Sequence, residues 1–370
     1  MKTVAVIMGT RPEIIKLAPV IAQLRESPVL RPFVVLTGQH DDLATSALQS
    51  FSITPDVSLG LMTENQSPTV LLSSALTALD IVLREHVQAG VAIQGDTTSA
   101  LAGALAAFHQ QLPIAHIEAG LRTHDLSAPF PEEMNRAVIS RMATLNFCPT
   151  ETAQHALETE RVPGVCYLVG NTVVDALLTT SARIERDSSS IQSEALDIVG
   201  KGRKILLVTG HRRENFEGPL QNLCNALRHI VMSNHDVQVV FPVHPNPNVR
   251  IPVQSELSGV ERVSLLAPLN YESSIFLMKH AALIISDSGG IQEEAPSFNV
   301  PVLVTRRSTE RSEALDCGVA QLINLEHPDE LIVAAQRRLQ GTQKRIAVKN
   351  PFGDGQAAMR IRTVLEDCWG

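Results

Sequence analysis

Carboxylates stand at three places where a proton-transferring group could work: Asp96, Glu118 and the acid pair Glu132-Glu133. The first two directly follow short apolar runs, and the third opens a helix-like segment. Asp96 and Glu132 also suit structural roles, because Asp caps helices and Glu is favoured in a first helical turn. Glu118, which precedes Ala119-Gly120, is harder to explain as a cap. Together the carboxylates at these three places predict acid–base chemistry at one edge of a sheet.

Positive charge follows the first apolar run, around Gly9-Thr10-Arg11-Pro12-Glu13. Pro12 suits the first turn of a helix, and the amides of that turn, with Arg11 and Lys16, would attract an anion. The pattern of a Walker phosphate loop is absent. The alternative is structural: Arg11 pairs with Glu13, and Lys16 is a solvated helix residue. This segment alone does not decide between the two.

The second half of the chain carries a further set of polar residues after apolar runs. His211 lies between Gly210 and two arginines, which gives its imidazole reason to face an anion. The glycines of Ser288-Gly289-Gly290 would let the backbone approach a phosphate. Glu294 would repel phosphate and suits a ribose diol, which donates hydrogen bonds. An ordinary turn before an acidic helix explains the last two features equally well.

The composition argues against several classes of protein. Of 370 residues, 44% are hydrophobic and 19% charged, as in soluble globular proteins. A net charge of −8 and 4% aromatic residues argue against a nucleic-acid partner. We expect no nicotinamide cofactor, because no G-x-G-x-x-G occurs, and no metal, because His, Asp and Glu do not cluster at ligand spacing. No apolar stretch approaches the ~20 residues that span a bilayer, so we expect no membrane partner.

The five cysteines are scattered without C-x-x-C spacing. This pattern predicts buried thiols in a reducing compartment rather than a disulfide framework or a zinc site. The apolar run at the N-terminus is too short for a signal peptide. We therefore expect a cytoplasmic protein.

Alternating strands and helices must position these side chains. Runs rich in Val and Ile without strict alternation predict parallel strands covered on both faces, and ligands bind at the carboxyl ends of such strands. The expected strands are 3–8, 33–37, 91–94, 114–117, 145–148, 166–169, 204–209, 237–242, 263–265, 282–286 and 302–304. The expected helices include 14–25, 69–86, 99–108, 220–232, 271–280 and 356–368.

The length predicts two domains at ~150 residues each. We expect an α/β fold with one domain over residues 1–170 and a second over 171–355. The polar segment 187–202 is predicted to be a loop of the second domain. The final helix, within 356–370, could dock on either domain.

Eight motifs resemble, in order and spacing, those of the non-hydrolysing UDP-N-acetylglucosamine 2-epimerases, from residue 3 to about residue 360. They are Gly9-Thr10-Arg11-Pro12-Glu13, Gly95-Asp96-Thr97-Thr98, Ile117-Glu118-Ala119-Gly120-Leu121-Arg122, Pro131-Glu132-Glu133-Met134-Asn135-Arg136, Gly170-Asn171-Thr172-Val173, Thr209-Gly210-His211-Arg212-Arg213-Glu214-Asn215, Asp287-Ser288-Gly289-Gly290-Ile291-Gln292-Glu293-Glu294 and Pro351-Phe352-Gly353-Asp354-Gly355.

The resemblance implies a glycosyltransferase-B-like fold: two Rossmann-like domains facing across a cleft, with the final helix returning to the first. It also implies a homodimer that interconverts UDP-GlcNAc and UDP-ManNAc without metal or nicotinamide cofactor, for cell-surface polysaccharide synthesis. The positions that match the family's catalytic residues are Asp96, Glu118, His211 and, from the acid pair, Glu132. Those that match its UDP contacts are Arg11, Lys16, Ser288, Gly289, Gly290, Glu294 and Arg311.

The chemistry explains why such residues are needed. The C2 hydrogen of an N-acetylhexosamine is not acidic until UDP begins to leave C1, so the expected path is elimination to a 2-acetamidoglucal and re-addition. Cations and amides stabilise the departing diphosphate, and carboxylates remove and return the proton. A closed cleft keeps water from the intermediate. We expect Asp96, Glu118 and Glu132 to share the proton transfers, with no face of the sugar assigned, and His211 to contact the diphosphate or its leaving oxygen.

Two departures from the family stand out. Ser273-Ser274 occupies the place where members carry an aromatic residue near the uracil. Gln39-His40 matches part of a regulatory UDP-GlcNAc site, with His244 as a third candidate, but Asp41-Asp42 and Asn65 stand where arginines are expected. Because two acids would repel a second diphosphate, we expect activation to be weak, absent or differently built. A sigmoidal rate curve abolished by changing Gln39 and His40 would contradict this.

Three other functions compete with this interpretation. A sister epimerase acting on a UDP-diacetamido-uronic acid should differ around His211. A glycosyltransferase of the same fold needs an acceptor groove and has no evident use for three acids on one sugar. A UDP-sugar sensor without turnover would tolerate loss of Asp96, Glu118 or Glu132, and all three are present.

Overall fold

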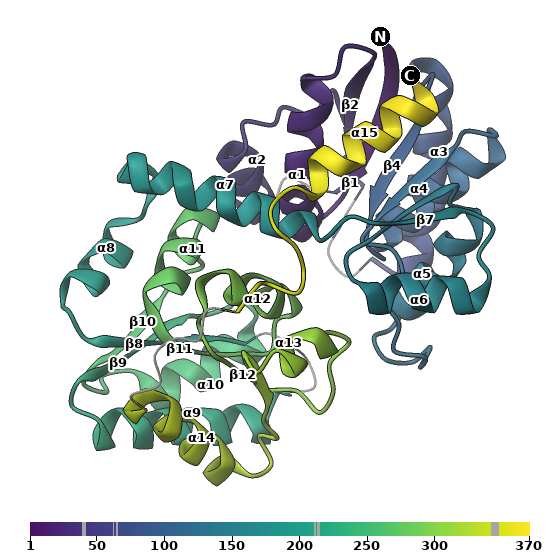
Figure 1. Cartoon of the computed structure of the whole chain (residues 1–370). Coiled ribbons are helices and arrows are strands. Elements are labelled where there is room, and N and C mark those ends of the chain that lie inside the picture. Colours follow the sequence, from purple (N-terminus) through teal and green to yellow (C-terminus); the bar gives the residue numbers. More distant parts are fainter. Residues whose placement is uncertain (39–41, 62, 64–65, 211, 213–214, 342–347) are drawn as a thin grey trace. The chain divides into compact units, whose positions relative to one another are not determined.

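The computed structural model describes residues 1–38, 42–61, 63, 66–210, 212, 215–341 and 348–370. The chain forms two compact units (Figure 1), which we call unit 1 (Met1–Leu178 with Phe352–Gly370) and unit 2 (Thr179–Pro351). The sequence-based boundary at residue 170 falls before α7 (Thr172–Arg186), whereas the units part inside that helix. The first half of α7 belongs to unit 1, where its side chains Val174 and Leu177 are buried.

Unit 1 is built on a parallel sheet of seven strands in the order β3-β2-β1-β4-β5-β6-β7. Its strands are β1 (Lys2–Met8), β2 (Leu30–Leu36), β3 (Val57–Ser58), β4 (Gly90–Gln94), β5 (Ile114–Ile117), β6 (Leu145–Cys148) and β7 (Val165–Leu168). Its helices, besides the start of α7, are α1 (Arg11–Arg25), α2 (Asp42–Ser50), α3 (Pro68–His86), α4 (Thr98–His109), α5 (Glu132–Met142), α6 (Glu151–Glu160) and α15 (Ala357–Trp369).

Both faces of this sheet are covered by helices. Ala5 and Ile7 of β1 share one core with buried residues of α3, α4 and α5. Val4 and Val6 alternate with them, so they point to the opposite face, and they too are fully buried. This double burial explains why the strands read as continuous Val and Ile runs.

Unit 2 repeats the plan with a parallel sheet in the order β10-β9-β8-β11-β12-β13. Its strands are β8 (Lys204–Thr209), β9 (Val237–Pro242), β10 (Val263–Leu266), β11 (Ala281–Ser286), β12 (Val302–Val304) and β13 (Ala320–Leu322). Its helices are the end of α7, the 3₁₀ turns η1 (Ser188–Ser190) and η3 (Ala295–Phe298), α8 (Ser193–Gly200), α9 (Gly218–Ser233), α10 (Pro247–Leu257), α11 (Tyr271–His280), α12 (Gly289–Glu294), α13 (Ser312–Asp316) and α14 (Pro328–Gln340).

The final helix belongs to unit 1, as the resemblance implies. In Figure 1 the yellow α15 lies beside the purple α1, and the two helices are in contact. Asp175 of α7 caps α15, because its carboxylate oxygens accept hydrogen bonds from the amides of Ala357 and Ala358 at 3.2 and 2.9 Å. The predicted α/β fold with two Rossmann-like sheets and a returning C-terminal helix is confirmed.

One local prediction was wrong. The segment 187–202 is not a loop, because it contains η1 and α8. Ala195 and Ile198 of α8 are buried, and the polar serines that suggested a loop precede this helix. The short strands β3 and β13 were not anticipated.

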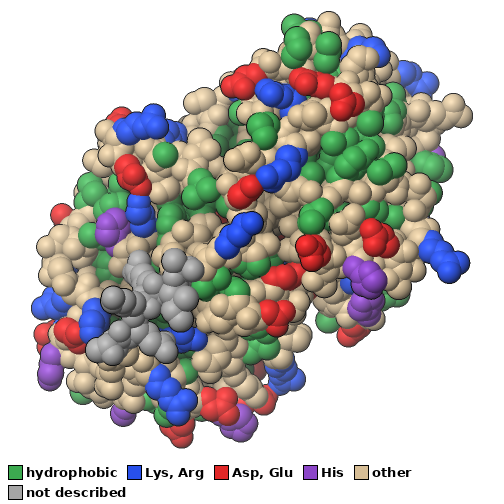
Figure 2. Space-filling model, in the orientation of Figure 1, with side chains coloured by type: hydrophobic (Ala, Val, Ile, Leu, Met, Phe, Trp, Pro, Cys, Tyr) green, Lys and Arg blue, Asp and Glu red, His purple; other side chains and the backbone are tan. Residues whose placement is uncertain are grey.

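No helix among the described residues is long and apolar enough to cross a membrane. On the face seen in Figure 2, acidic and basic side chains are interspersed, and no continuous basic stripe crosses it.

Candidate active site

The carboxyl ends of β4 and β5 place two of the predicted carboxylates in unit 1. Asp96 lies two residues after the end of β4, and Gly95 separates it from the strand. Gly95 has a φ of +70°, a backbone conformation that suits glycine. Glu118 comes directly after β5 and has a φ of +63°, in the left-handed region that a non-glycine residue rarely adopts. A strained backbone of this kind is found where a side chain must be aimed at a site.

Glu118 is buried and fully engaged. One carboxylate oxygen, Oε1, lies 2.5 Å from the Lys16 ammonium and accepts a hydrogen bond from the Asn171 amide at 3.0 Å. The other accepts a hydrogen bond from Gln94, the last residue of β4. These donors fix the direction of the Glu118 carboxylate. Lys16, which the resemblance places on UDP, is thus paired with Glu118 here.

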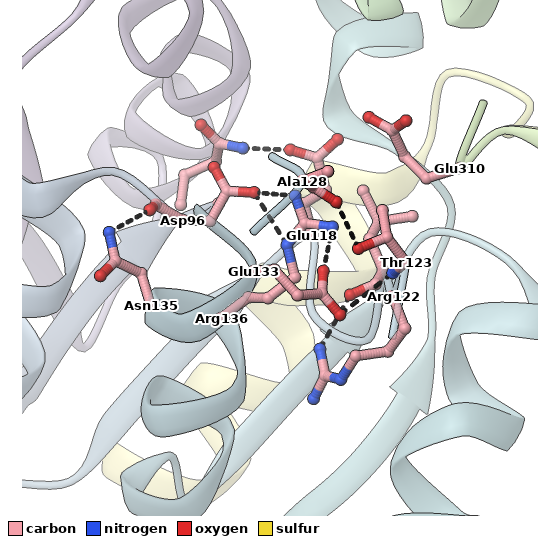
Figure 3. A network of polar contacts seen from close by, with 12 residues as sticks. Asp96, Glu118, Arg122, Thr123, Ala128, Glu133, Asn135, Arg136 and Glu310 are labelled. Atoms are coloured by element: carbon pink, nitrogen blue, oxygen red, sulfur yellow. Dashed lines mark hydrogen bonds and ion pairs between the residues drawn. The ribbon is translucent and has the colours of Figure 1, made fainter. Parts of the chain in front are cut away.

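Asp96 is held by α5. Both Nε and Nη2 of Arg136 contact Asp96 Oδ2, with Nε at 3.0 Å. The Asn135 side chain donates to the Asp96 carbonyl at 2.8 Å. Figure 3 shows Arg136 between Asp96 and Glu133. The Asp96 side chain is 25% exposed while that of Arg136 is 6% exposed, so the cation is buried behind a carboxylate that solvent reaches.

The acid pair at the start of α5 divides its roles. Glu133 is buried, its Oε2 lies 3.1 Å from Arg136, and its Oε1 accepts the backbone N–H groups of Thr123 and His124 at 3.0 Å. Glu132 is half-buried and has no hydrogen bond or ion pair within the part of the chain that the structure describes. Glu133 therefore anchors the loop after β5, and Glu132 is the member of the pair that remains available for chemistry.

The segment after β1 forms the start of α1, with Arg11 half-buried at its first position. The Glu13 carboxylate turns back on this start. Its Oε2 accepts hydrogen bonds from the amides of Gly9 and Thr10, at 3.1 and 2.8 Å, and its Oε1 accepts one from the Thr97 hydroxyl at 2.8 Å. It thus ties the turn after β1 to the turn after β4. Burial raises the pKa of Glu13 to about 7, although these hydrogen bonds act to lower it.

This raised pKa gives a testable pH dependence. Glu13 ionises near its ordinary value of 4.5 in the unfolded chain and only near 7 when folded, so its contribution to stability is lost as the pH rises from 4.5 to 7. Glu13→Gln removes this titration and keeps an acceptor for the two amides. Between pH 5 and pH 8, we expect the free energy of unfolding of the variant to rise by about 2 to 3 kcal/mol relative to that of wild type.

Urea unfolding followed by the fluorescence of Trp369, the single tryptophan, reports on unit 1. The exposed Glu151, in the first turn of α6, supplies the matched control Glu151→Gln. A difference between Glu13→Gln and wild type that stays constant with pH would show that Glu13 ionises alike in both states.

Unit 2 holds the other predicted substrate contacts. Ser288, Gly289 and Gly290 follow β11, and the Arg311 guanidinium lies against Gly289 so closely that a Cβ there would be 2.6 Å from its central carbon. Any larger residue at 289 would therefore displace the Arg311 guanidinium. Arg311 Nε donates to Glu293 at 2.8 Å, and its Nη1 contacts Glu310. Four of the predicted UDP contacts, namely Ser288, Gly289, Gly290 and Arg311, thus lie in the same unit.

Sequence reasoning missed the charged groups behind Arg311. Glu310 Oε2 accepts a hydrogen bond from Arg306 Nη1 at 3.0 Å. Burial acts to raise the pKa of Glu310, but Arg311 and Arg306 outweigh it and hold that pKa well below its usual range. Asp287 accepts the backbone N–H of Arg212 at 2.9 Å and an amide hydrogen of Asn215 at 3.1 Å. The arginine-rich sequence 305–311 was the available signal.

Glu294 is buried, and Tyr271 of α11 donates its hydroxyl to Glu294 Oε1 at 3.0 Å. The two serines expected near a base have partners within unit 2. Ser273 Oγ accepts a hydrogen bond from the backbone N–H of Gln192 at 2.9 Å. Ser274 Oγ donates a hydrogen bond to the backbone carbonyl of Asn270 at 2.8 Å.

Only some of the other residues named from the sequence lie in the part of the chain that the structure describes. His211, Gln39 and His40 lie outside the described residues. In the turn after β9, the His244 ring nitrogen Nδ1 accepts a hydrogen bond from the backbone N–H of Asn246 at 3.2 Å. Among the described residues, no group of three or more His, Cys, Asp or Glu side chains is placed to hold a metal ion.

Two units, each built on a parallel sheet with polar side chains at the carboxyl ends of its strands, define a two-domain, Rossmann-like α/β protein. The sequence profile described as UDP-N-acetylglucosamine 2-epimerase matches residues 22–366. Over 98% of each chain, the sequence is 42% identical to the UDP-N-acetylglucosamine 2-epimerase of Salmonella typhimurium. The chain therefore belongs to the UDP-N-acetylglucosamine 2-epimerase family.

Solved structures agree with this assignment. The UDP-GlcNAc 2-epimerase from Neisseria meningitidis, in a crystal structure with UDP-GlcNAc bound, has a TM-score of 0.93 at 36% identity, covering 99% of this chain and 100% of that one. The enzyme from Methanocaldococcus jannaschii, in complex with UDP-GlcNAc and UDP, has a TM-score of 0.85 at 30% identity, covering 99% of each chain.

Proposed function

We propose that the protein interconverts UDP-GlcNAc and UDP-ManNAc by eliminating UDP across C1 and C2 and adding it back. The observation that carries the proposal is the pair of carboxylates at adjacent strand ends, Asp96 and Glu118, each contacted by a buried cation. A sugar held at this edge of the sheet would meet bases whose direction is fixed. Family membership supports the substrate.

The proposed reaction balances without an added reagent. As the C1–O bond breaks, its electron pair leaves with the β-phosphate oxygen of UDP. A carboxylate takes the C2 proton, and the electrons of the C2–H bond form the C1–C2 double bond of 2-acetamidoglucal. In the return step UDP attacks C1 while a proton is delivered to C2 from the opposite face, which gives the epimer.

The acid–base roles are proposed for Asp96, Glu118 and Glu132. Proton transfer of this kind contributes typically about 10²- to 10⁴-fold to a rate. Glu118 is held by Lys16, Gln94 and Asn171, whereas the half-buried Glu132 side chain makes no hydrogen bond or ion pair with the described residues and can adjust to a sugar. No face of the sugar is assigned to any of the three.

The diphosphate is proposed to bind the Ser288-Gly289-Gly290 backbone with Arg311, together with Arg11, Lys16 and His211. Cationic groups stabilise the charge that develops on the leaving diphosphate, and this is where such groups lower a barrier most. Glu294 is proposed to accept hydrogen bonds from the ribose hydroxyls. The Tyr271 hydroxyl supports this role, because it fixes the Glu294 carboxylate.

Incubation with UDP-GlcNAc in deuterated water tests the function. We expect proton NMR to show deuterium at C2 and the appearance of the manno isomer. A protein that binds UDP-GlcNAc but gives no exchange at C2 would be a sensor or a transferase. Adding candidate acceptor sugars to that sample would separate these two.

The biological setting is also proposed. A cytoplasmic location is supported by the five cysteines, which are free in the structure. A homodimer and a role in polysaccharide synthesis rest on the family resemblance. Light scattering coupled to size-exclusion chromatography tests the dimer.

A further inference from the structure

We propose that His116 is a positioning residue for Asp96: from the neighbouring strand it clamps Gly95, and so holds the turn that carries Asp96. This inference rests on the proposed function, in which Asp96 transfers a proton. His116 lies on β5, two residues before Glu118, and its hydrogen bond reaches the turn of Asp96 through the carbonyl of Gly95.

Two hydrogen bonds to β5 hold Gly95, one through its amide and one through its carbonyl. The Gly95 amide donates to the Ile117 carbonyl at 3.0 Å, and the His116 Nε2 lies 2.7 Å from the Gly95 carbonyl oxygen. Gly95 has a φ of +70°, so the chain turns sharply between β4 and Asp96. A freely turning glycine would let Asp96 move, whereas two hydrogen bonds to β5 fix both of its peptide groups.

The imidazole can serve only as a neutral donor. His116 is fully buried, and burial lowers its pKa to about 4. Arg122 and Arg136 face it and oppose a further positive charge. Because a carbonyl oxygen accepts and never donates, Nε2 carries the single proton of the neutral ring. His116 therefore holds Gly95 unchanged across the pH range in which the enzyme is expected to work.

The rest of its surroundings gives no reason for a histidine. Within the described residues, His116 Nδ1 has no hydrogen-bond partner, and neither has the side-chain amide of Asn146, its register partner on β6. On its other side His116 pairs with Ile93, which belongs to the aliphatic core of unit 1. A buried polar atom without a partner costs stability, so an aliphatic residue would suit this position better if packing alone decided. The Nε2 contact with Gly95 is what the imidazole provides.

Two variants separate positioning from packing. His116→Leu fills the core but cannot donate, whereas His116→Gln can place an amide N–H near the position of Nε2. We expect His116→Leu to lower kcat for epimerisation about 10- to 100-fold, because small displacements of a catalytic group cost factors of that size. KM for UDP-GlcNAc and Kd for UDP should change less than about threefold. His116→Gln should recover most of kcat and keep the wild-type pH profile.

Ile114→Ala is the matched control, a truncation in the core of the same strand without contact to Gly95 in the structure. It should lower the unfolding temperature and leave kcat at the wild-type value. Full kcat in His116→Leu, or equal losses in the Leu and Gln variants, would overturn the positioning role. A pH profile displaced in His116→Gln would show that His116 titrates in the reaction and would also overturn it. Failure of the wild-type protein to exchange C2 would instead remove the proposed function itself.

Discussion

Asp96→Asn is expected to lower kcat for epimerisation about 10³-fold, within the range that general acid–base groups contribute. Asparagine keeps the size of the side chain and an oxygen that can accept from Arg136 Nε, so the fold around β4 and α5 should persist. It cannot take up the C2 proton. Rates of C2 deuteration and of manno-isomer formation, measured on the same sample, should fall together.

The surface pair Asp80 and Arg84 on α3 offers the control Asp80→Asn. It removes an Asp–Arg contact of 2.9 Å in the same unit, with side chains 39% and 70% exposed, and should leave kcat unchanged. UDP affinity should stay within about threefold of wild type in both variants. If Asp96→Asn kept more than about a tenth of the wild-type kcat, Asp96 would not be a catalytic residue.

Arg136→Met is expected to damage both stability and activity. Arg136 is buried and contacts Asp96 and Glu133 at once. Its removal leaves Glu133 as a buried charge without its cation, and breaking a buried ion pair in this way costs about 3 to 5 kcal/mol. We expect a loss of that size in urea unfolding followed by Trp369 fluorescence. We also expect kcat to fall about 100-fold, because Asp96 is no longer directed.

Arg136→Lys separates charge from geometry. A lysine keeps the positive charge but cannot reproduce the planar contacts that guanidinium nitrogens make with two carboxylates. It should recover part of the stability and little of kcat. Arg141→Met, an exposed change in the last turn of the same helix, should alter neither quantity. If Arg136→Lys restored kcat fully, charge alone would account for the role of Arg136.

The sequence predicted the sheets well because their central strands are buried on both faces. Five predicted strands coincide with β5, β6, β8, β9 and β12, and the other six differ from the observed strands by one to three residues at an end. The strands β3 and β13 were missed because they have two and three residues, too few for any pattern to emerge. The helix α8 was missed because the serines before it indicate a loop. Its two buried side chains also give only a weak helical periodicity of apolar residues.

The part of the site that was predictable is the part that the order of the strands determines. Asp96 and Glu118 lie side by side because they end neighbouring parallel strands, and the order of apolar runs already suggested this. Their partners were not predictable. Arg136 lies 40 residues from Asp96, and Asn171 lies 53 residues from Glu118. Both partners stand in motifs of the family resemblance, but nothing in the sequence shows that they contact these two carboxylates.

Glu133 illustrates the same limit. The acid pair at the start of α5 was identified, and Glu132 was chosen from the family pattern. Only the structure shows that Glu133 is occupied by Arg136 and by the amides of Thr123 and His124. Which of two adjacent carboxylates is buried depends on how the helix packs, and this depends on contacts far away in the chain.

Positional isotope exchange tests most directly whether UDP truly departs from C1. UDP-GlcNAc carrying ¹⁸O in the bond between C1 and the β-phosphorus would be incubated with the protein, and ³¹P NMR would follow the label. If the C1–O bond breaks and re-forms, the label will scramble into the non-bridging oxygens of the β-phosphate in step with epimerisation. Manno isomer formed with the label still in the bridge would contradict elimination and re-addition.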